Sequence, residues 1–187
     1  MNRIISALTF FAIISFTIAQ TQLGSDIDGE GPYGQFGRSV SMNSAGNRMA
    51  IGANSNSQPN NYNAGHVRVY DLANGSWEQV GEDIDGEAEN DQSGWSVSMN
   101  SSGDRVAIGA YKNDGNGTDA GHVRVYDLVN GSWTQVGEDI DGEAAGDRFG
   151  SSVSMNSPGD RMAIGAYWND GNGTGAGHVR VYDLVNG

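Results

Sequence analysis

The sequence predicts an all-β protein made of β-propeller-type blades, each a sheet of four antiparallel strands, repeated three times. The first observation is the repeat itself: the string Gly-His-Val-Arg-Val-Tyr-Asp-Leu recurs with its histidine at His66, His122 and His178, 56 residues apart. The second is that each repeat contains short stretches of alternating apolar and polar residues, the period of a β-strand. The third is an Asn-Gly pair, such as Asn130-Gly131, which is typical of a tight hairpin.

The second repeat shows the four strands that we expect in each blade. Residues 95–99 alternate apolar and polar, and a turn-forming Ser-Ser-Gly-Asp sequence separates them from a second strand over 105–111. A polar loop leads to a third strand over 122–126, and the Asn-Gly turn leads to a fourth over 132–136. A single sheet of this kind would leave two apolar faces in water, so we expect neighbouring blades to stack and bury them.

The period places the repeats at about 24–80, 81–136 and 137–187. Three blades are fewer than the roughly four to eight that close a propeller, and the third repeat stops inside its hairpin turn. Residues 21–24 resemble the end of a fourth strand. We therefore expect an incomplete propeller that forms the N-terminal part of a longer product. The alternative is self-association through the exposed blade edge, with two arcs completing one ring.

Residues 1–19 have the features of a secretory signal peptide. Arg3 supplies a positive charge, residues 4–19 carry no charge, and Ala19 precedes a polar stretch. An apolar run of this length, at about 1.5 Å per residue, is too short for the roughly 30 Å hydrocarbon core of a membrane. We therefore predict cleavage after Ala19 and a secreted or cell-surface protein.

The residues after the signal peptide are strongly acidic. These 168 residues carry nine Lys and Arg against 23 Asp and Glu, a net charge of −14. Such a surface repels phosphate groups, so we expect no nucleic-acid partner and, after signal cleavage, no membrane insertion. The sequence contains no cysteine, so burial, strand pairing or metal ions must stabilise an exported protein that lacks disulfides.

Three motifs carry a resemblance to a known family. Phe149-Gly150, then residues 163–166 (Ala-Ile-Gly-Ala) and 177–182 (Gly-His-Val-Arg-Val-Tyr), resemble the FG-GAP repeat of integrin-α-type β-propellers. With the acidic run 137–143, the chain is closest to bacterial exported proteins of this type. The second repeat departs from the motif with Ser93-Gly94. The resemblance implies a calcium loop between the first two motifs, but the turns there are too short and too poor in carboxylates, so we do not assign one to them.

Two other kinds of loop are acidic enough to hold calcium. The stretch Asp-Ile-Asp-Gly-Glu places carboxylates at alternate positions, and the polar loop of the second repeat has the oxygen spacing of the first half of a calcium loop. The candidate calcium ligands are Asp83, Asp85, Glu87, Asp139, Asp141, Glu143, Asp114 and Asn116. The alternative, which we favour, is that these residues build turns and keep the protein soluble.

The repeats also bear on the kind of function to expect. Residues 81–131 and 137–187 differ at only nine of 51 positions, so we do not expect chemistry that is private to one repeat. A zinc ion shared by histidines of neighbouring blades would require their convergence at the axis, so we expect the histidines to be packed or hydrogen-bonded. We predict a non-enzymatic, exported scaffold that recognises a protein or glycan, as in adhesion. The alternatives are an accessory part of a larger secreted enzyme, a hydrolase or lyase, and a passive structural spacer.

Overall fold

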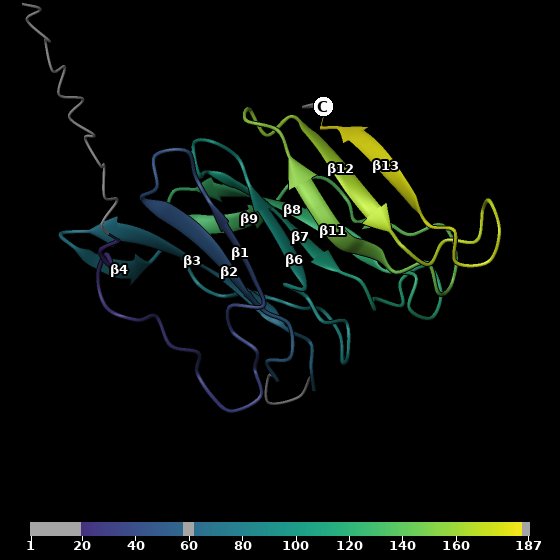
Figure 1. The fold of residues 1–187 in the computed structure, drawn as a ribbon, viewed down its shortest axis with the longest axis horizontal. Helices are drawn as coiled ribbons and strands as arrows, with labels where there is room; N and C mark the ends of the chain where they lie inside the picture. The colour runs from purple at the N-terminus through teal and green to yellow at the C-terminus, as the bar shows by residue number, and fades with distance from the viewer. Residues whose placement is uncertain (1–19, 58–61, 185–187) are drawn as a thin grey trace, which may run out of the picture.

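The computed structural model describes residues 20–57 and 62–184. Over these residues every regular element is a β-strand, and the strands form three sheets that follow one another along the chain (Figure 1). This confirms the all-β, propeller-type fold. The predicted signal peptide over 1–19 lies outside the described residues, so it stays a prediction. In the described part of the chain, no helix has the length and apolar character needed to cross a membrane.

Each sheet contains the strands of one repeat, the first two sheets add a short strand from the start of the next repeat, and all the paired strands are antiparallel. The first sheet contains β1 (Ser39–Met42), β2 (Arg48–Ala53), β3 (His66–Ala73), β4 (Ser76–Gln79) and β5 (Ile84–Asp85). The second contains β6 (Ser96–Met99), β7 (Arg105–Ala110), β8 (His122–Val129), β9 (Ser132–Gln135) and β10 (Ile140–Asp141). The third contains β11 (Phe149–Met155), β12 (Arg161–Ala166) and β13 (His178–Asp183).

The Asn-Gly pairs form the predicted hairpins. Asn74 and Gly75 join β3 to β4 with φ angles of 50° and 83°, and Asn130 and Gly131 join β8 to β9 with 52° and 84°. Two successive residues with positive φ make a type I′ turn, whose twist matches that of the strands on either side. The turn chemistry therefore sets the register of the outer strands.

The acidic stretch extends the sheet of each of the first two repeats. Ile84 pairs with Val67, and Ile140 pairs with Val123, so β5 and β10 continue the outer edge beyond β4 and β9. The first sheet thus runs past residue 80, where the period suggested a boundary. A period gives the length of a repeat but does not fix where the repeat begins.

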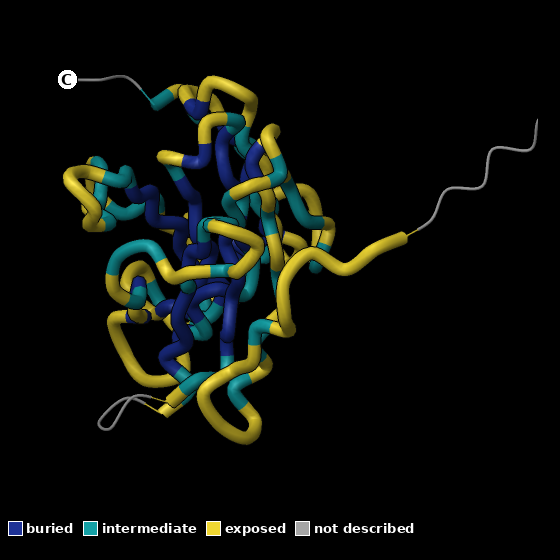
Figure 2. The backbone as a smooth tube through the Cα atoms, turned by 90° about the vertical axis from the view of Figure 1, so that its left-hand side faces the viewer, coloured by how far each residue is buried: buried dark blue, intermediate teal, exposed yellow. Residues whose placement is uncertain are grey.

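The sheets stack face to face, and the buried backbone lies in the middle of the molecule with exposed loops around it (Figure 2). Val67 of β3 shares a buried cluster with Met99 of β6, and Val123 of β8 shares another with Phe149 of β11. Burial of these side chains against the next blade is the main term that stabilises such an array.

The two outward faces of the stack expose residues that are buried at the inner junctions. Val40 of β1 and Val179 of β13 are 65% and 66% exposed, whereas their equivalents Val97 and Val123 are buried. Self-association through such faces, the alternative considered from the sequence, stays a prediction.

Repeating hydrogen bonds tie each blade to the next. Ser39 Oγ donates to the carbonyl oxygen of Gly94, and Ser96 Oγ donates to that of Gly150, each at 2.8 Å. Gly109 makes this close approach possible, because a Cβ there would overlap the carbonyl oxygen of Gly150. The same contacts at both junctions bring the loops of successive repeats to one side of the stack.

Candidate functional site

The loop that leads into the inner strand of each blade (β1, β6 or β11) begins its left-handed backbone at one equivalent position, and further left-handed residues follow in every repeat. This position is Asn90 in the second repeat (φ 66°), Gly146 in the third (φ 86°) and Tyr33 in the first (φ 67°). Asn and Gly adopt this conformation readily, whereas a bulky side chain is strained there. Gln35, Gln92 and Arg148 are left-handed in all three loops, whereas a bulky residue at this first position occurs only in the first repeat. Because backbone strain collects at binding sites, this difference makes the first loop a candidate site.

The next residue is a buried aspartate in the second and third repeats. Asp91 accepts hydrogen bonds from Asn113 Nδ2 at 2.9 Å and from the backbone N of Ala88 at 3.2 Å. Asp147 accepts the equivalent bond from Asn169 Nδ2 at 2.8 Å. In both repeats the carboxylate thus closes the space between this loop and the loop after the second strand.

The first repeat has Gly34 at this position, while its backbone keeps the same contact. The backbone N of Ser55 donates to the oxygen of Gly34 at 3.3 Å, as that of Lys112 donates to Asp91 at 3.4 Å. A Cβ on Gly34 would make ordinary contacts, the nearest at 3.7 Å from the oxygen of Gly31. Where the other repeats have this carboxylate, the first repeat has an open cleft of about 510 Å³.

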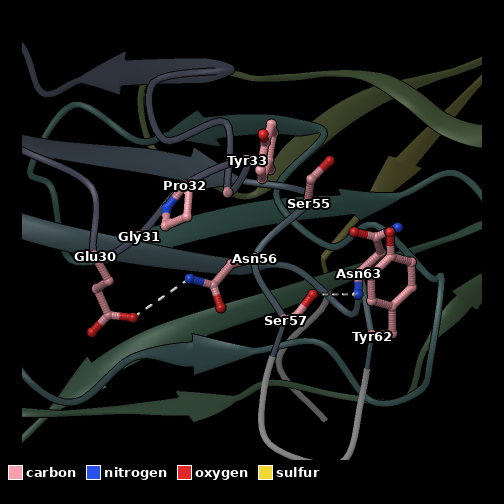
Figure 3. A pocket seen from close by; sticks show the side chains of 10 residues that line it. Glu30, Gly31, Pro32, Tyr33, Ser55, Asn56, Ser57, Tyr62 and Asn63 are labelled. Atoms are coloured by element: carbon pink, nitrogen blue, oxygen red, sulfur yellow. Dashed lines mark hydrogen bonds between the residues drawn. The ribbon is translucent and has the colours of Figure 1, made fainter.

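Polar and aromatic residues line this cleft (Figure 3). Asn56 points toward Glu30, with Nδ2 3.4 Å from Oε2, and Ser57 Oγ accepts a hydrogen bond from the backbone N of Asn63 at 3.1 Å. The full lining comprises Glu30, Gly31, Pro32, Tyr33, Gly34, Ser55, Asn56, Ser57, Tyr62 and Asn63.

The cleft presents two exposed aromatic rings beside amide and carboxylate groups. Tyr33 is 90% exposed and Tyr62 is 62% exposed, so both rings are free to pack on a ligand. Glu30 forms an ion pair with Arg68, which offsets the negative charge of the cleft. The arrangement suits a ligand that has apolar surface and several hydrogen-bonding groups but little charge.

The predicted calcium ligands at the start of the two acidic stretches contact an arginine and two glutamines. Asp83 forms a two-point ion pair with Arg68, in which Nε and Nη2 each lie 2.8 Å from a carboxylate oxygen. Burial opposes ionisation of Asp83, but the bonds from Arg68 and Gln79 hold its pKa below the ordinary value. Asp139 accepts a hydrogen bond from Gln135 Nε2 at 2.7 Å.

The second aspartates of these stretches lie in strands. Asp85 pairs with His66 and Asp141 with His122, so each shares a sheet face with its histidine, and burial raises the pKa of both carboxyl groups. Glu143, in the connection to the third sheet, lies 3.4 Å from Arg180 Nη1.

The polar loop of the second repeat lies against an acidic stretch. Asn116 Nδ2 donates to the backbone oxygens of Gly142 at 2.8 Å and Glu143 at 3.2 Å, while Asp114 Oδ1 accepts from the backbone N of Asp119 at 2.7 Å. The structure thus brings the two kinds of predicted calcium segment together, with hydrogen bonds that hold the turns in place. Calcium binding stays a prediction.

The sequence reasoning missed two groups in which a histidine meets carboxylates of separate segments. They are Glu30, His66 and Asp83 in the first repeat and Glu87, His122 and Asp139 in the second, with ligand-type atoms within 4.8 Å of one another. A signal was present: the histidine follows the glutamate by 35 or 36 residues and precedes the aspartate by 17.

Burial shapes the charges in the second group. It lowers the pKa of His122 to about 4, with Arg124 acting in the same direction, so the imidazole is neutral near pH 7. Burial also raises the pKa of Glu87, against the effect of Arg124, and the nearby carboxyl of Asp139 raises it further.

Comparisons with known proteins match two of the repeats to a family model. Residues 84–126 and 139–182 each match the family model of the FG-GAP repeat. No curated protein matches the chain. Among solved structures, the chain is similar to Kuenenia stuttgartiensis hydrazine synthase, with 13% identity, 85% of this chain and 36% of that chain covered, and a TM-score of 0.48. The chain therefore spans about a third of the length of that protein.

Proposed function

We propose that this FG-GAP-like repeat protein is a non-enzymatic, exported recognition module that binds a neutral glycan in the cleft of its first repeat. The observation that carries the proposal is that the cleft lies where the first repeat differs from the other two at two adjacent positions. Gly34 replaces the aspartate that closes the same place in the other repeats, and Tyr33 occupies a position that favours Asn or Gly. Neither change is expected to stabilise the fold: Tyr33 adopts a strained backbone conformation, and Gly34 lacks the hydrogen bonds of the aspartate.

The composition of the cleft supports recognition. Tyrosine supplies a large, rigid contact area at low entropic cost, while Ser, Gly and Asn supply adaptable hydrogen bonds, the same combination that antibody loops use. Eight of the ten lining residues are of these four types, the exceptions being Pro32 and Glu30.

The chemistry of the cleft favours a sugar over a charged ligand. The exposed faces of Tyr33 and Tyr62 can pack on the C–H face of a pyranose ring, and Asn56 and Asn63 can bond its hydroxyl groups. Arg68 already pairs with Glu30, so the cleft offers little net attraction to a cation. Location outside the cell, where glycans are abundant, rests on the signal-like character of residues 1–19.

A single substitution tests the proposal. The purified protein is screened against an array of neutral oligosaccharides, and the affinity for the best probe is measured by titration calorimetry for wild type and Gly34→Asp. We expect the new aspartate to accept a hydrogen bond from Asn56, as Asp91 does from Asn113, and to close the cleft. Binding should then fall at least about tenfold, or ~1.4 kcal/mol, while the melting temperature stays equal or rises.

A matched control separates the cleft from aromatic residues elsewhere. Tyr167→Ala removes an exposed ring of the third repeat, outside the cleft, and should leave the affinity unchanged. A silent array would refute glycan recognition, and so would a Gly34→Asp variant with wild-type affinity. Binding to a surface protein, or no binding at all, would favour the protein-ligand and spacer alternatives respectively.

A further inference from the structure

The second repeat carries a cluster that the proposed recognition site does not use. Its three side chains come from separate segments: Glu87 from the connection between β5 and β6, His122 from the first residue of β8, and Asp139 from the residue before β10. Their ligand-type atoms lie within 4.8 Å of one another at the junction between the first two blades.

The histidine of this cluster is buried without a hydrogen-bond partner for one ring nitrogen. The side chain of His122 is 1% exposed, and within residues 20–57 and 62–184 its Nδ1 has no hydrogen-bond partner, although it lies 3.4 Å from Asp139 Oδ2. A buried polar atom left in this way costs free energy, and native structures rarely retain one without a reason. A neutral imidazole nitrogen that faces carboxylates is a ready ligand for a metal ion.

The two carboxyl groups of the cluster also approach each other. Carboxylate oxygens of Glu87 and Asp139 lie within 4.8 Å of each other, a spacing at which two ionised carboxylates repel unless a cation offsets their charge. Arg124 pairs with Glu87 at 3.1 Å, but over the described ranges 20–57 and 62–184 it forms no ion pair with Asp139. The arginine therefore offsets only part of the negative charge.

In the first repeat both ring nitrogens of the equivalent His66 are also buried without a hydrogen-bond partner among the described residues, but an arginine offsets the charge of the cluster. There Arg68 pairs with both carboxylates, Glu30 and Asp83. The guanidinium thus offsets the charge of both carboxylates, which lowers their attraction for a metal ion. The difference between Arg68 and Arg124 makes the second cluster the candidate and the first its natural control.

We propose that Glu87, His122 and Asp139 bind a first-row transition-metal ion such as Zn²⁺ at the junction between the first two blades. Zinc accepts imidazole and carboxylate ligands and, where three residues bind it, keeps a water in the fourth position, whereas calcium prefers six to eight oxygen ligands. Tetrahedral zinc at its usual bond lengths of about 2.0–2.1 Å requires ligand atoms about 3.4 Å apart. A small movement of Glu87, whose side chain is 46% exposed, brings the atoms to that spacing and leaves a path for the ion.

The test is zinc binding by the purified protein after treatment with a chelator. Titration calorimetry should show one Zn²⁺ per chain, and NMR of the imidazole nitrogens should show a shift for one histidine of the three. Loss of one ligand should weaken zinc binding by about 100-fold or more, because even residues that only orient a ligand cost roughly 10- to 100-fold when they are replaced. The variants are Glu87→Gln, Asp139→Asn and His122→Gln. His66→Gln, the matched change in the first repeat, should leave the affinity unchanged.

Melting curves recorded with chelator show that each variant is folded, and the half-exposed Glu87→Gln keeps the test valid if the buried variants do not fold. Three results would overturn the proposal: no zinc binding by the wild type, wild-type affinity in Glu87→Gln, or equal losses in His66→Gln and His122→Gln. The outcome is independent of glycan recognition, because none of the three ligands lines the cleft.

Discussion

Relief of the strain at Tyr33 should stabilise the protein. Tyr33 has a φ of 67°, and the left-handed conformation costs a residue with a Cβ about 1–2 kcal/mol. Because the side chain is 90% exposed, it recovers little of this cost by packing. Asparagine tolerates the conformation, so Tyr33→Asn should raise the unfolding free energy by about 1 kcal/mol, which corresponds to a rise in melting temperature of roughly 2–4 °C for a protein of this size.

The second repeat supplies the reciprocal experiment. Asn90 is exposed and has a φ of 66°, so Asn90→Tyr introduces the same strain without a change in burial. It should lower the melting temperature by a similar amount. Both variants are measured by thermal unfolding with circular dichroism, in parallel with glycan binding, which Tyr33→Asn should weaken and Asn90→Tyr should not.

Two results would refute this reasoning. If Tyr33→Asn leaves the melting temperature unchanged or lowers it, the ring contributes contacts that outweigh the backbone strain. If Asn90→Tyr is neutral, the left-handed position is not strained by a tyrosine at all.

Two further predictions concern the blade junction and the buried histidines. Gly109→Ala should destabilise the protein by about 1–3 kcal/mol or more, because its Cβ would overlap the fixed backbone of Gly150. Gly165→Ala should cost less, because its Cβ would meet only the movable Ser152 hydroxyl at close range. Chemical denaturation of both variants measures the difference. Burial lowers the pKa of His66, although the negative charge of Asp83 opposes this shift. Near and below pH 6.5 the unfolded chain therefore binds more protons than the folded protein, so the folded protein should lose stability as the pH falls through that range. Melting temperatures in chelator from pH 7 to 5 should fall less steeply for His66→Gln, and equal slopes would contradict the assignment.

Strand positions were predictable because their signals are local. Residues 105–111 and 122–126, expected as strands from alternation, correspond to β7 and β8, and the Asn-Gly pairs form the expected turns. The short β5 was not expected as part of the first sheet, because Ile84 and Asp85 are strand residues only through pairing with Val67 and His66. Pairing between distant segments leaves no local period in the sequence.

The candidate sites depended on comparisons that a single stretch of sequence does not contain. The expectation that no repeat would have chemistry of its own came from the second and third repeats, whereas the cleft arises in the first, at Gly34 and Tyr33. The cluster at His122 combines residues 35 and 17 positions away, and only folding brings them within reach. The sequence did indicate which residue types to examine, since the acidic stretches contribute Glu87 and Asp139.

The serine bonds at the blade junctions bear on how such a protein evolves. Ser39 and Ser96 make the same contact to the following blade, and each junction depends only on the two repeats that form it. A whole repeat can therefore be gained or lost by recombination, since any copy presents the surface that its neighbour requires. The same independence releases the loops from selection for stacking, so one copy can acquire a ligand specificity while its sisters preserve the architecture.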